Sequence, residues 1–357
     1  MEALEGQHAE DQHAEGQHTE GQHSPRIPDT SLKLRSGFQM PQWAFVIPGA
    51  CTLSDMMVHV RRAFDMGYRH FHHVPYETDD IQDLTKGAAA LRSLVEVGGC
   101  QRDELFISSE VTKLGGFRNA GYALVRAEVE AIVHEYGESI GYVDLMVLSY
   151  PNNEPAFERK AEWRALMEMV EAGKVRSIGV SDYDIGLLRE LNTHDRQVAR
   201  LRRENPSVGG AVLSVVRWNI QQWNAGKEIA AWCAPRGIRV EIYGLLPHGP
   251  VTCQHTCQHP LKVLATSYNT SQAQILLRWM IQKKYIPLPD HPYTPGALVD
   301  AVHYEKNARV CQFELTQDEV ARVSEVEFWP VHWARLGIPH HFKSNRKLAK
   351  ATNSGGR

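Results

Sequence analysis

The chain has 357 residues, of which 43% are hydrophobic and 23% are charged, and its formal net charge is -3. These values are ordinary for a globular protein and exclude the strongly basic character expected of a nucleic-acid-binding protein. The sequence has no apolar run of the roughly 18 residues that a membrane span requires. Length and charge allow one large α/β domain or two smaller ones, with neither nucleic acid nor a membrane as partner.

The first 28 residues differ from the rest of the chain. The pentapeptides E-G-Q-H-A, E-D-Q-H-A, E-G-Q-H-T and E-G-Q-H-S follow one another there. A period of five matches neither a helix face nor a strand face, so we predict a disordered tail over residues 1–28. The four histidines of the repeat could bind a transition metal weakly, but a polar repeat-expanded tail is the favoured interpretation. We predict no metal site.

The expected location is the cytoplasm. The N-terminus lacks the charged start and apolar core of a secretory signal. The six cysteines do not suggest a disulfide framework for a chain of this length. Both observations favour a reducing compartment.

From about residue 30 the pattern becomes one of alternating strands and helices. Residues 31–40 predict a short hairpin that turns at Arg35, Ser36 and Gly37. Eight short runs rich in Val, Ile, Leu and Phe follow, as is typical of strands buried on both faces. These runs cover residues 44–48, 68–72, 105–109, 143–149, 176–181, 211–216, 239–243 and 285–288.

The segments between the runs favour a barrel. Amphipathic helices are predicted over residues 53–66, 120–136, 157–171, 227–234 and 271–283. Eight strand–helix units in about 300 residues predict an α/β fold of the (β/α)8 TIM-barrel type. The alternative, an open doubly wound sheet, usually carries a G-x-G-x-x-G turn after its first strand, and the sequence has none. We place the barrel at residues 29–335 and a basic C-terminal tail at 336–357.

Polar residues stand at the ends of the predicted strands. In TIM barrels the site lies at the carboxyl ends of the strands. Here these ends carry His72, His73, Glu110, Ser149, Tyr150, Ser181, Asp182, Arg217, Trp218 and Tyr243. Since successive side chains alternate faces, only one of His72 and His73 can point into the barrel mouth. We expect Glu110 to pair with one of them, as a structural pair or as a general acid–base pair, and His70 to lie between strand and helix.

Seven motifs carry a resemblance to a known family. They are L-K-L-R-S-G-F-Q-M-P (32–41), A-F-D-M-G-Y-R-H-F (63–71), R-D-E-L-F-I-S-S (102–109), Y-V-D-L-M-V-L-S-Y-P (142–151), G-K-V-R-S-I-G-V-S-D-Y (173–183), A-Q-I-L-L-R-W (273–279) and F-E-L-T-Q-D-E-V (313–320). Through them, residues 31–330 resemble the aldo-keto reductase family. The resemblance implies a barrel that reduces small aldehydes and ketones with NADPH.

The family's catalytic tetrad is altered in this sequence. In the family a tyrosine donates the proton to the carbonyl, and a lysine held by an aspartate lowers the pKa of that tyrosine. The resemblance puts His72 at the aspartate, Glu110 at the lysine and Ser149 at the histidine of the tetrad. Tyr76 is the counterpart of the tyrosine, one residue closer to the strand. Because a carboxylate beside a phenol raises the pKa of the phenol, we predict altered or lost catalysis.

The resemblance also identifies cofactor positions. Ser181 and Asp182 stand where the family's Ser-Asn holds the nicotinamide amide, Ser214 where its glutamine stands, and Tyr243 where its stacking tyrosine stands. The lysine and arginine that grip the extra phosphate of NADP should follow residue 287, but residues 288–297 contain neither. We therefore expect NADP binding to be weakened or lost.

One further motif and two functions stay open. C-Q-H-T-C-Q-H, residues 253–259, contains zinc-ligand types, but a duplicated surface loop explains it as well. The resemblance implies an NAD(P)H-linked oxidoreductase of carbonyl compounds, with altered chemistry expected from the replaced tetrad. The alternative is a catalytically inactive member that acts as a binding or regulatory subunit of an unknown protein partner.

Overall fold

The computed structural model describes residues 26–49, 51–74, 81–111, 121–149, 151, 155–204, 211–244, 259–289 and 302–326. Most of the predicted N-terminal tail, the C-terminal tail, Tyr76, Tyr150 and residues 253–258 lie outside these ranges. Among the described residues, no helix is long and apolar enough to cross a membrane.

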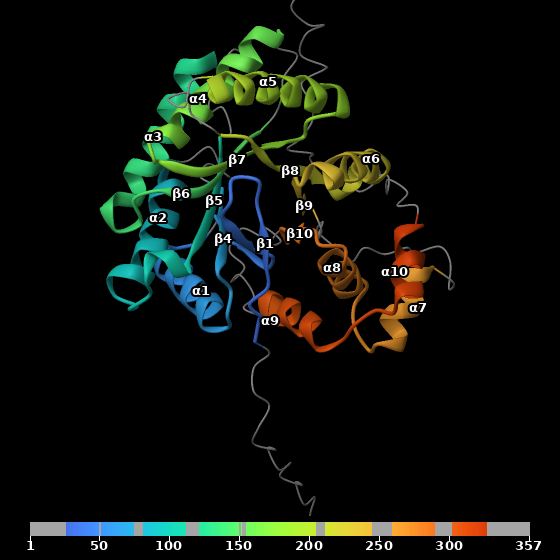
Figure 1. Ribbon diagram of the computed structural model, residues 1–357. Helices are drawn as coiled ribbons and strands as arrows, with labels where there is room; N and C mark the ends of the chain where they lie inside the picture. The colour runs from blue at the N-terminus through green and yellow to red at the C-terminus, as the bar shows by residue number, and fades with distance from the viewer. Residues whose placement is uncertain are drawn as a thin grey trace, which may run out of the picture.

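Eight parallel strands form a nearly closed (β/α)8 barrel with helices around it (Figure 1). The strands are β3 (Ala44–Val46), β4 (His70–His73), β5 (Phe106–Val111), β6 (Val143–Leu148), β7 (Val175–Ser181), β8 (Leu213–Asn219), β9 (Arg239–Tyr243) and β10 (Ile286–Pro287). Each strand pairs with the next one along the chain. The predicted barrel is confirmed, and each of the eight apolar runs overlaps a strand.

Ten α-helices lie in the described parts of the chain. They are α1 (Leu53–Asp65), α2 (Ile81–Glu96), α3 (Gly121–Ile140), α4 (Ala156–Glu171), α5 (Ile185–Glu204), α6 (Trp223–Cys233), α7 (Pro260–Ser267), α8 (Gln272–Gln282), α9 (Val302–Ala308) and α10 (Gln317–Ser324). Helix α2 was not predicted from the sequence, although Leu84, Ala88, Leu91 and Leu94 recur at helical spacing and are buried. Gly87 is needed there, since a Cβ would stand 2.1 Å from His73 Nε2.

A hairpin closes the amino-terminal end of the barrel. Strands β1 (Ser31–Lys33) and β2 (Gln39–Pro41) pair antiparallel, as predicted. Arg35 Nη1 donates to the carbonyl of Leu213 at 2.8 Å, at the start of β8. The hairpin and the inward strand faces together form the interior core, which contains Leu32, Leu34, Met40, Ala44, Phe106, Leu145, Val147, Val215, Ile286 and Leu288. The opposite, carboxyl-terminal end is left for polar side chains.

The outward strand faces pack against the helices in a second and larger core. Ile27 belongs to this core, is 6% exposed, and donates its N–H to the Met66 carbonyl at 2.8 Å. The packed chain therefore includes a residue of the predicted tail. Trp218, at the end of β8, also points outward, because it packs against Trp223 of α6 at a ring distance of 6.3 Å.

Candidate active site

The three histidines of β4 alternate between the two faces of the strand. His73 points outward, and its Nδ1 lies 3.0 Å from the Tyr136 hydroxyl on α3. His72 points inward, which confirms that one of the pair faces the barrel. The expectation that His70 lies between strand and helix is wrong, because the period of two puts it on the same face as His72. Its Nε2 lies 2.7 Å from Ser108 Oγ inside the barrel.

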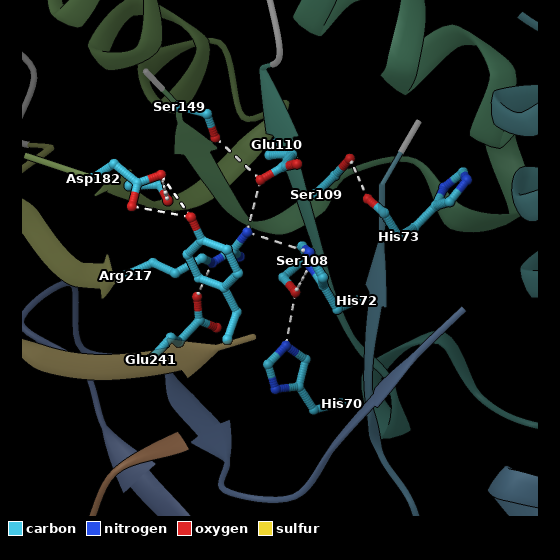
Figure 2. Close-up of polar contacts among 12 residues, drawn as sticks. His70, His72, His73, Ser108, Ser109, Glu110, Ser149, Asp182, Arg217 and Glu241 are labelled. Atoms are coloured by element: carbon cyan, nitrogen blue, oxygen red, sulfur yellow. Dashed lines mark hydrogen bonds and ion pairs between the residues drawn. The ribbon is translucent and has the colours of Figure 1, made fainter. Parts of the chain in front are cut away.

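Arg217 of β8 occupies the centre of the barrel mouth (Figure 2). Its Nη1 donates to Glu110 Oε2 of β5 at 2.8 Å, and its Nε donates to Glu241 Oε2 of β9 at 2.8 Å. Nη1 also lies 3.3 Å from His72 Nε2 of β4. Arg217 is 3% exposed and Glu241 is 0% exposed. One guanidinium therefore links four strands through side chains that solvent barely reaches.

The expected pairing of Glu110 with a histidine is wrong. The Arg217 guanidinium binds both Glu110 and His72, and a delocalised cation with several donors suits this role better than an imidazole does. Ser149 Oγ donates to Glu110 Oε2 at 3.1 Å. The structure thus brings His72, Glu110 and Ser149 together around Arg217, whereas Tyr76 lies outside the described residues.

Burial shapes the charges of this cluster. It lowers the pKa of His72 well below the ordinary value, and the positive charge of Arg217 lowers it further. It also raises the pKa of Glu241, against the opposing effect of Arg217. Burial alone would lower the pKa of Arg217, but Glu241 and Glu110 outweigh it and the pKa of Arg217 is raised. The cluster therefore contains a neutral imidazole and a permanently charged guanidinium.

A second group lies beside the first, at the ends of β7 and β9. The Tyr243 hydroxyl contacts both carboxylate oxygens of Asp182, at 3.0 and 2.8 Å, and Ser181 Oγ lies 3.4 Å from Oδ2. Asp182 has a φ of 60°, a left-handed conformation that is uncommon outside glycine. Burial raises the pKa of Asp182 against the lowering effect of the Tyr243 hydrogen bond, and the charge of Glu110 raises it further.

Ser214 does not join either group. It is fully buried, and its hydroxyl donates to the Val212 carbonyl at 3.0 Å. Three positions separate it from Arg217 along β8, which puts the two side chains on opposite faces of the strand. Of the four positions that the sequence suggested for a cofactor, Ser181, Asp182 and Tyr243 lie together and Ser214 lies apart.

Sequence analysis gave no role to Arg217 or Glu241. Arg217 was noted at a strand end, and Glu241 was not singled out at all. The signal was present, because each is a charged residue between apolar neighbours, in V-V-R-W-N or R-V-E-I-Y. A buried charge needs a partner, and these two are direct register neighbours on β8 and β9.

No cluster in the described ranges is suited to hold a metal ion. The predicted zinc-like loop contributes one described residue, His259, whose ring nitrogen accepts from the Leu261 N–H at 3.3 Å at the start of α7. The other candidate ligands of that loop lie outside the described residues.

Comparison with known proteins gives a consistent result. The family profile described as Aldo/keto reductase family matches residues 43–327. The chain is 28% identical over 292 residues to the uncharacterized oxidoreductase YtbE of Bacillus subtilis, covering 81% of this chain and 90% of the relative. It is 24% identical over 293 residues to the glyoxal reductase of the same organism, covering 82% of this chain and 91% of that one.

Solved structures share the fold. An aldo/keto reductase from Brucella melitensis matches with a TM-score of 0.60 at 22% identity, covering 84% of this chain and all (100%) of the other. A Bombyx mori aldo-keto reductase in complex with NADP matches with a TM-score of 0.60 at 20% identity, covering 84% of this chain and 92% of the other. At these identities the likeness supports the barrel and its connectivity.

Proposed function

The chain belongs to the aldo/keto reductase family, and on this premise we propose that it is an NAD(P)H-linked oxidoreductase of small carbonyl compounds with altered acid–base groups. The observation that carries the proposal is the convergence of polar side chains from several strands at the carboxyl-terminal mouth. His72, Glu110, Ser149, Asp182, Arg217 and Tyr243 all contribute to the two linked groups there. A substrate site in this fold is expected at that end.

The groups at the ends of β7 and β9 fit the nicotinamide end of a cofactor. An amide NH2 needs an acceptor, which the Asp182 carboxylate offers, and an amide oxygen needs a donor, which the Ser181 hydroxyl offers. Tyr243 adds an aromatic side chain beside them. These three residues would hold the nicotinamide, and the bound cofactor would supply the hydride. The segment expected to bind the extra phosphate of NADP lies largely outside the described residues, so weakened NADP binding remains part of the proposal.

The chain's own contribution to reduction is a proton for the carbonyl oxygen. The family's lysine position carries Glu110, and the cation at the mouth comes instead from Arg217. Glu110 and Glu241 both bind that cation, which reduces the field that it exerts on a phenol. We propose that proton transfer uses Tyr76 or another hydroxyl of the mouth, at a rate below that of a site with a free lysine.

Oxidation of NADPH in the presence of a small dicarbonyl tests the proposal. Glyoxal is the first substrate to try, because a relative is named glyoxal reductase. We expect slow, saturable turnover that Tyr243→Phe weakens mainly through KM for the cofactor. Asp103→Ala, on the surface at the closed end of the barrel, is the matched control. Absence of turnover with NADPH and NADH across aldehydes, ketones and dicarbonyls would reject the oxidoreductase proposal.

The closed ion-pair cluster favours a second candidate, a catalytically inactive member that serves as a binding or regulatory subunit. Arg217 is bound by two carboxylates, and His72 is held neutral. For this candidate, restoration of the tetrad by His72→Asp, Glu110→Lys and Ser149→His should create activity that the parent lacks. Arg217→Met must be added, because a lysine at position 110 would otherwise lie beside the guanidinium, and Glu241→Gln with it, because Glu241 would lose the partner of its buried carboxylate.

The proposed location is the cytoplasm. Three cysteines in the described ranges, Cys100, Cys233 and Cys311, are free thiols. Free thiols suit a reducing compartment. Labelling of thiols in protein from freshly lysed cells tests this, with full labelling of all cysteines expected after denaturation.

A further inference from the structure

A chain of hydrogen bonds runs from Arg217 to His70 through His72 and Ser108 (Figure 2). Arg217 Nη1 lies 3.3 Å from His72 Nε2, and His72 Nδ1 lies 3.0 Å from Ser108 Oγ. Ser108 Oγ in turn lies 2.7 Å from His70 Nε2. None of the four residues is more than 3% exposed. Solvent therefore does not compete for the protons of this chain.

The direction of the chain follows from Arg217. A guanidinium has donors and no acceptor, so it can contact His72 Nε2 only if that nitrogen accepts. The single proton of the neutral ring is then on Nδ1, which donates to Ser108 Oγ. The Ser108 hydroxyl is left to donate to His70 Nε2. The donor or acceptor role of each group therefore determines the role of the next one, starting from Arg217, which can only donate.

We propose that Arg217 is the positioning residue of this site, and that it holds His72 as the neutral tautomer with its proton on Nδ1. In this state Nε2 carries no proton to give, and its lone pair is occupied by the guanidinium. The tautomer is independent of the proposed oxidoreductase activity. Its consequence, that His72 is not the proton donor of the reaction, rests on that proposed function.

The charged surroundings of His72 support this assignment. Arg217 faces it from β8, while His70 and His73 flank it on its own strand. Glu110 of β5 and Glu241 of β9 are directed to the guanidinium, not to the imidazole. A proton added at Nε2 would therefore place a second positive charge against Arg217 in buried surroundings, where such a charge is costly. The pKa of His72 is lowered for the same two reasons, burial and Arg217.

If the His72 imidazole does not donate the proton, the hydroxyl groups at the mouth are the remaining candidates for the proton donor. Ser149 and Tyr243 both donate to carboxylates there. A pH profile of the proposed activity should therefore lack a step that His72→Gln abolishes. Arg217 acts through His72 and Glu110 and need not touch the substrate.

Nitrogen NMR of histidine in the full-length protein tests the tautomer directly. With 15N-histidine labelling, the His72 signals are identified as those missing from His72→Gln. We expect a protonated, pyrrole-type Nδ1 and an unprotonated, pyridine-type Nε2, unchanged between about pH 5 and 8, the range in which an ordinary histidine titrates. Arg217→Met should shift the Nε2 signal toward the protonated type and introduce titration within that range.

Two further variants distinguish the effect of Arg217 on the His72 tautomer from the effects of other residues. Ser108→Ala removes the partner of Nδ1 but leaves the guanidinium, so the tautomer should persist. Arg176→Met removes an arginine at the closed end of the barrel and should leave the His72 signals unchanged. Wild-type signals in Arg217→Met would overturn the proposal, as would a protonated Nε2 in the wild type or in Ser108→Ala. If Arg217→Met does not fold, the spectra of the wild type and of Ser108→Ala still test the proposal.

Discussion

At the closed end of the barrel, the buried ion pairs are also hydrogen-bonded to the backbone, whereas at the open end the ion pairs contact only other side chains among the described residues. Asp144 accepts from Arg102 at 2.7 Å, from Arg176 at 3.2 Å and from the Ile107 N–H at 2.9 Å. Arg102 also donates to the carbonyls of Leu105, Ile140 and Tyr142. Arg217 at the open end instead contacts Glu110, Glu241 and His72 through their side chains.

The cluster around Asp144 at the closed end is therefore part of the fold itself, whereas the side chains of the cluster around Arg217 at the open end can be exchanged. Backbone groups cannot be substituted, so an ion pair built into them is tied to the fold. A cluster of side chains can be replaced by other side chains without moving a strand. Residues of the site at the open end can therefore be substituted while the barrel stays the same. This is expected in a fold whose function depends on one end and whose stability depends on the other. The following predictions test this division.

The largest effect is expected at the closed end. Asp144→Ala should lower the free energy of unfolding by about 3–5 kcal/mol, because it leaves the charge of Arg102 and a buried N–H without their partner. Urea unfolding at neutral pH measures the change. A loss below about 1 kcal/mol would contradict the structural role of this cluster.

Arg217→Met should cost somewhat less, about 3 kcal/mol, because it strands Glu110 and Glu241. The triple variant Arg217→Met, Glu110→Gln, Glu241→Gln tests the comparison between the two ends. It removes all three charges and should recover most of the free energy of unfolding that Arg217→Met loses. No such recovery is expected when Asp144→Ala is combined with Arg102→Met, since the backbone groups remain unpaired. If the combined variants recovered the free energy of unfolding equally at both ends, the two clusters would not differ in the way proposed.

Acid should destabilise the barrel interior through His70, at the start of β4. Burial lowers the pKa of His70 to about 3 in the folded chain, against an ordinary 6.5. The unfolded chain then binds more protons than the folded one between these values, so stability falls as pH decreases through that window. From pH 7 to 5 His70 contributes a loss of about 2 kcal/mol.

The test is the pH dependence of urea unfolding in His70→Gln. Its loss of stability from pH 7 to 5 should be smaller than the wild-type loss by about 2 kcal/mol. His134→Gln, which removes an exposed histidine of α3, is the control. An identical slope in wild type and His70→Gln would show that His70 is not held neutral.

The smallest effect is expected for Tyr243→Phe. The hydroxyl contacts a partly exposed carboxylate, so its loss should reduce the free energy of unfolding by about 1 kcal/mol or less. It should also raise the pKa of Asp182 further, because the hydrogen bond from Tyr243 lowers it. Carbon-13 NMR of labelled aspartate measures that shift, and an unchanged Asp182 signal would contradict the contact.

Much of the fold could be predicted because it depends on local pattern. Strands buried on both faces leave apolar runs, and the hairpin leaves a turn at Gly37, so these elements were found. Helix α2 was missed although Leu84, Ala88, Leu91 and Leu94 give it a buried apolar face, while Gly87 allows close contact with His73. The rule that sites lie at strand ends also found Glu110 and Asp182 without any structure.

The connections within the site could not be predicted, since they depend on distance across the barrel. Glu110 is 107 positions from Arg217 in the chain, and His72 is 145 positions from it. No local pattern shows that a guanidinium on β8 reaches both. The inward direction of His70 was predictable from the strand period, which puts it on the same face as His72.

Titration of the purified chain with NADPH and NADH, followed by tryptophan fluorescence, tests the central claim that a nicotinamide cofactor binds at the open end. We predict saturable quenching with a Kd in the micromolar range, weakened by Asp182→Ala and unaffected by Asp103→Ala at the closed end. The claim is contradicted if neither cofactor produces saturable quenching up to millimolar concentration, or if the two variants weaken binding equally.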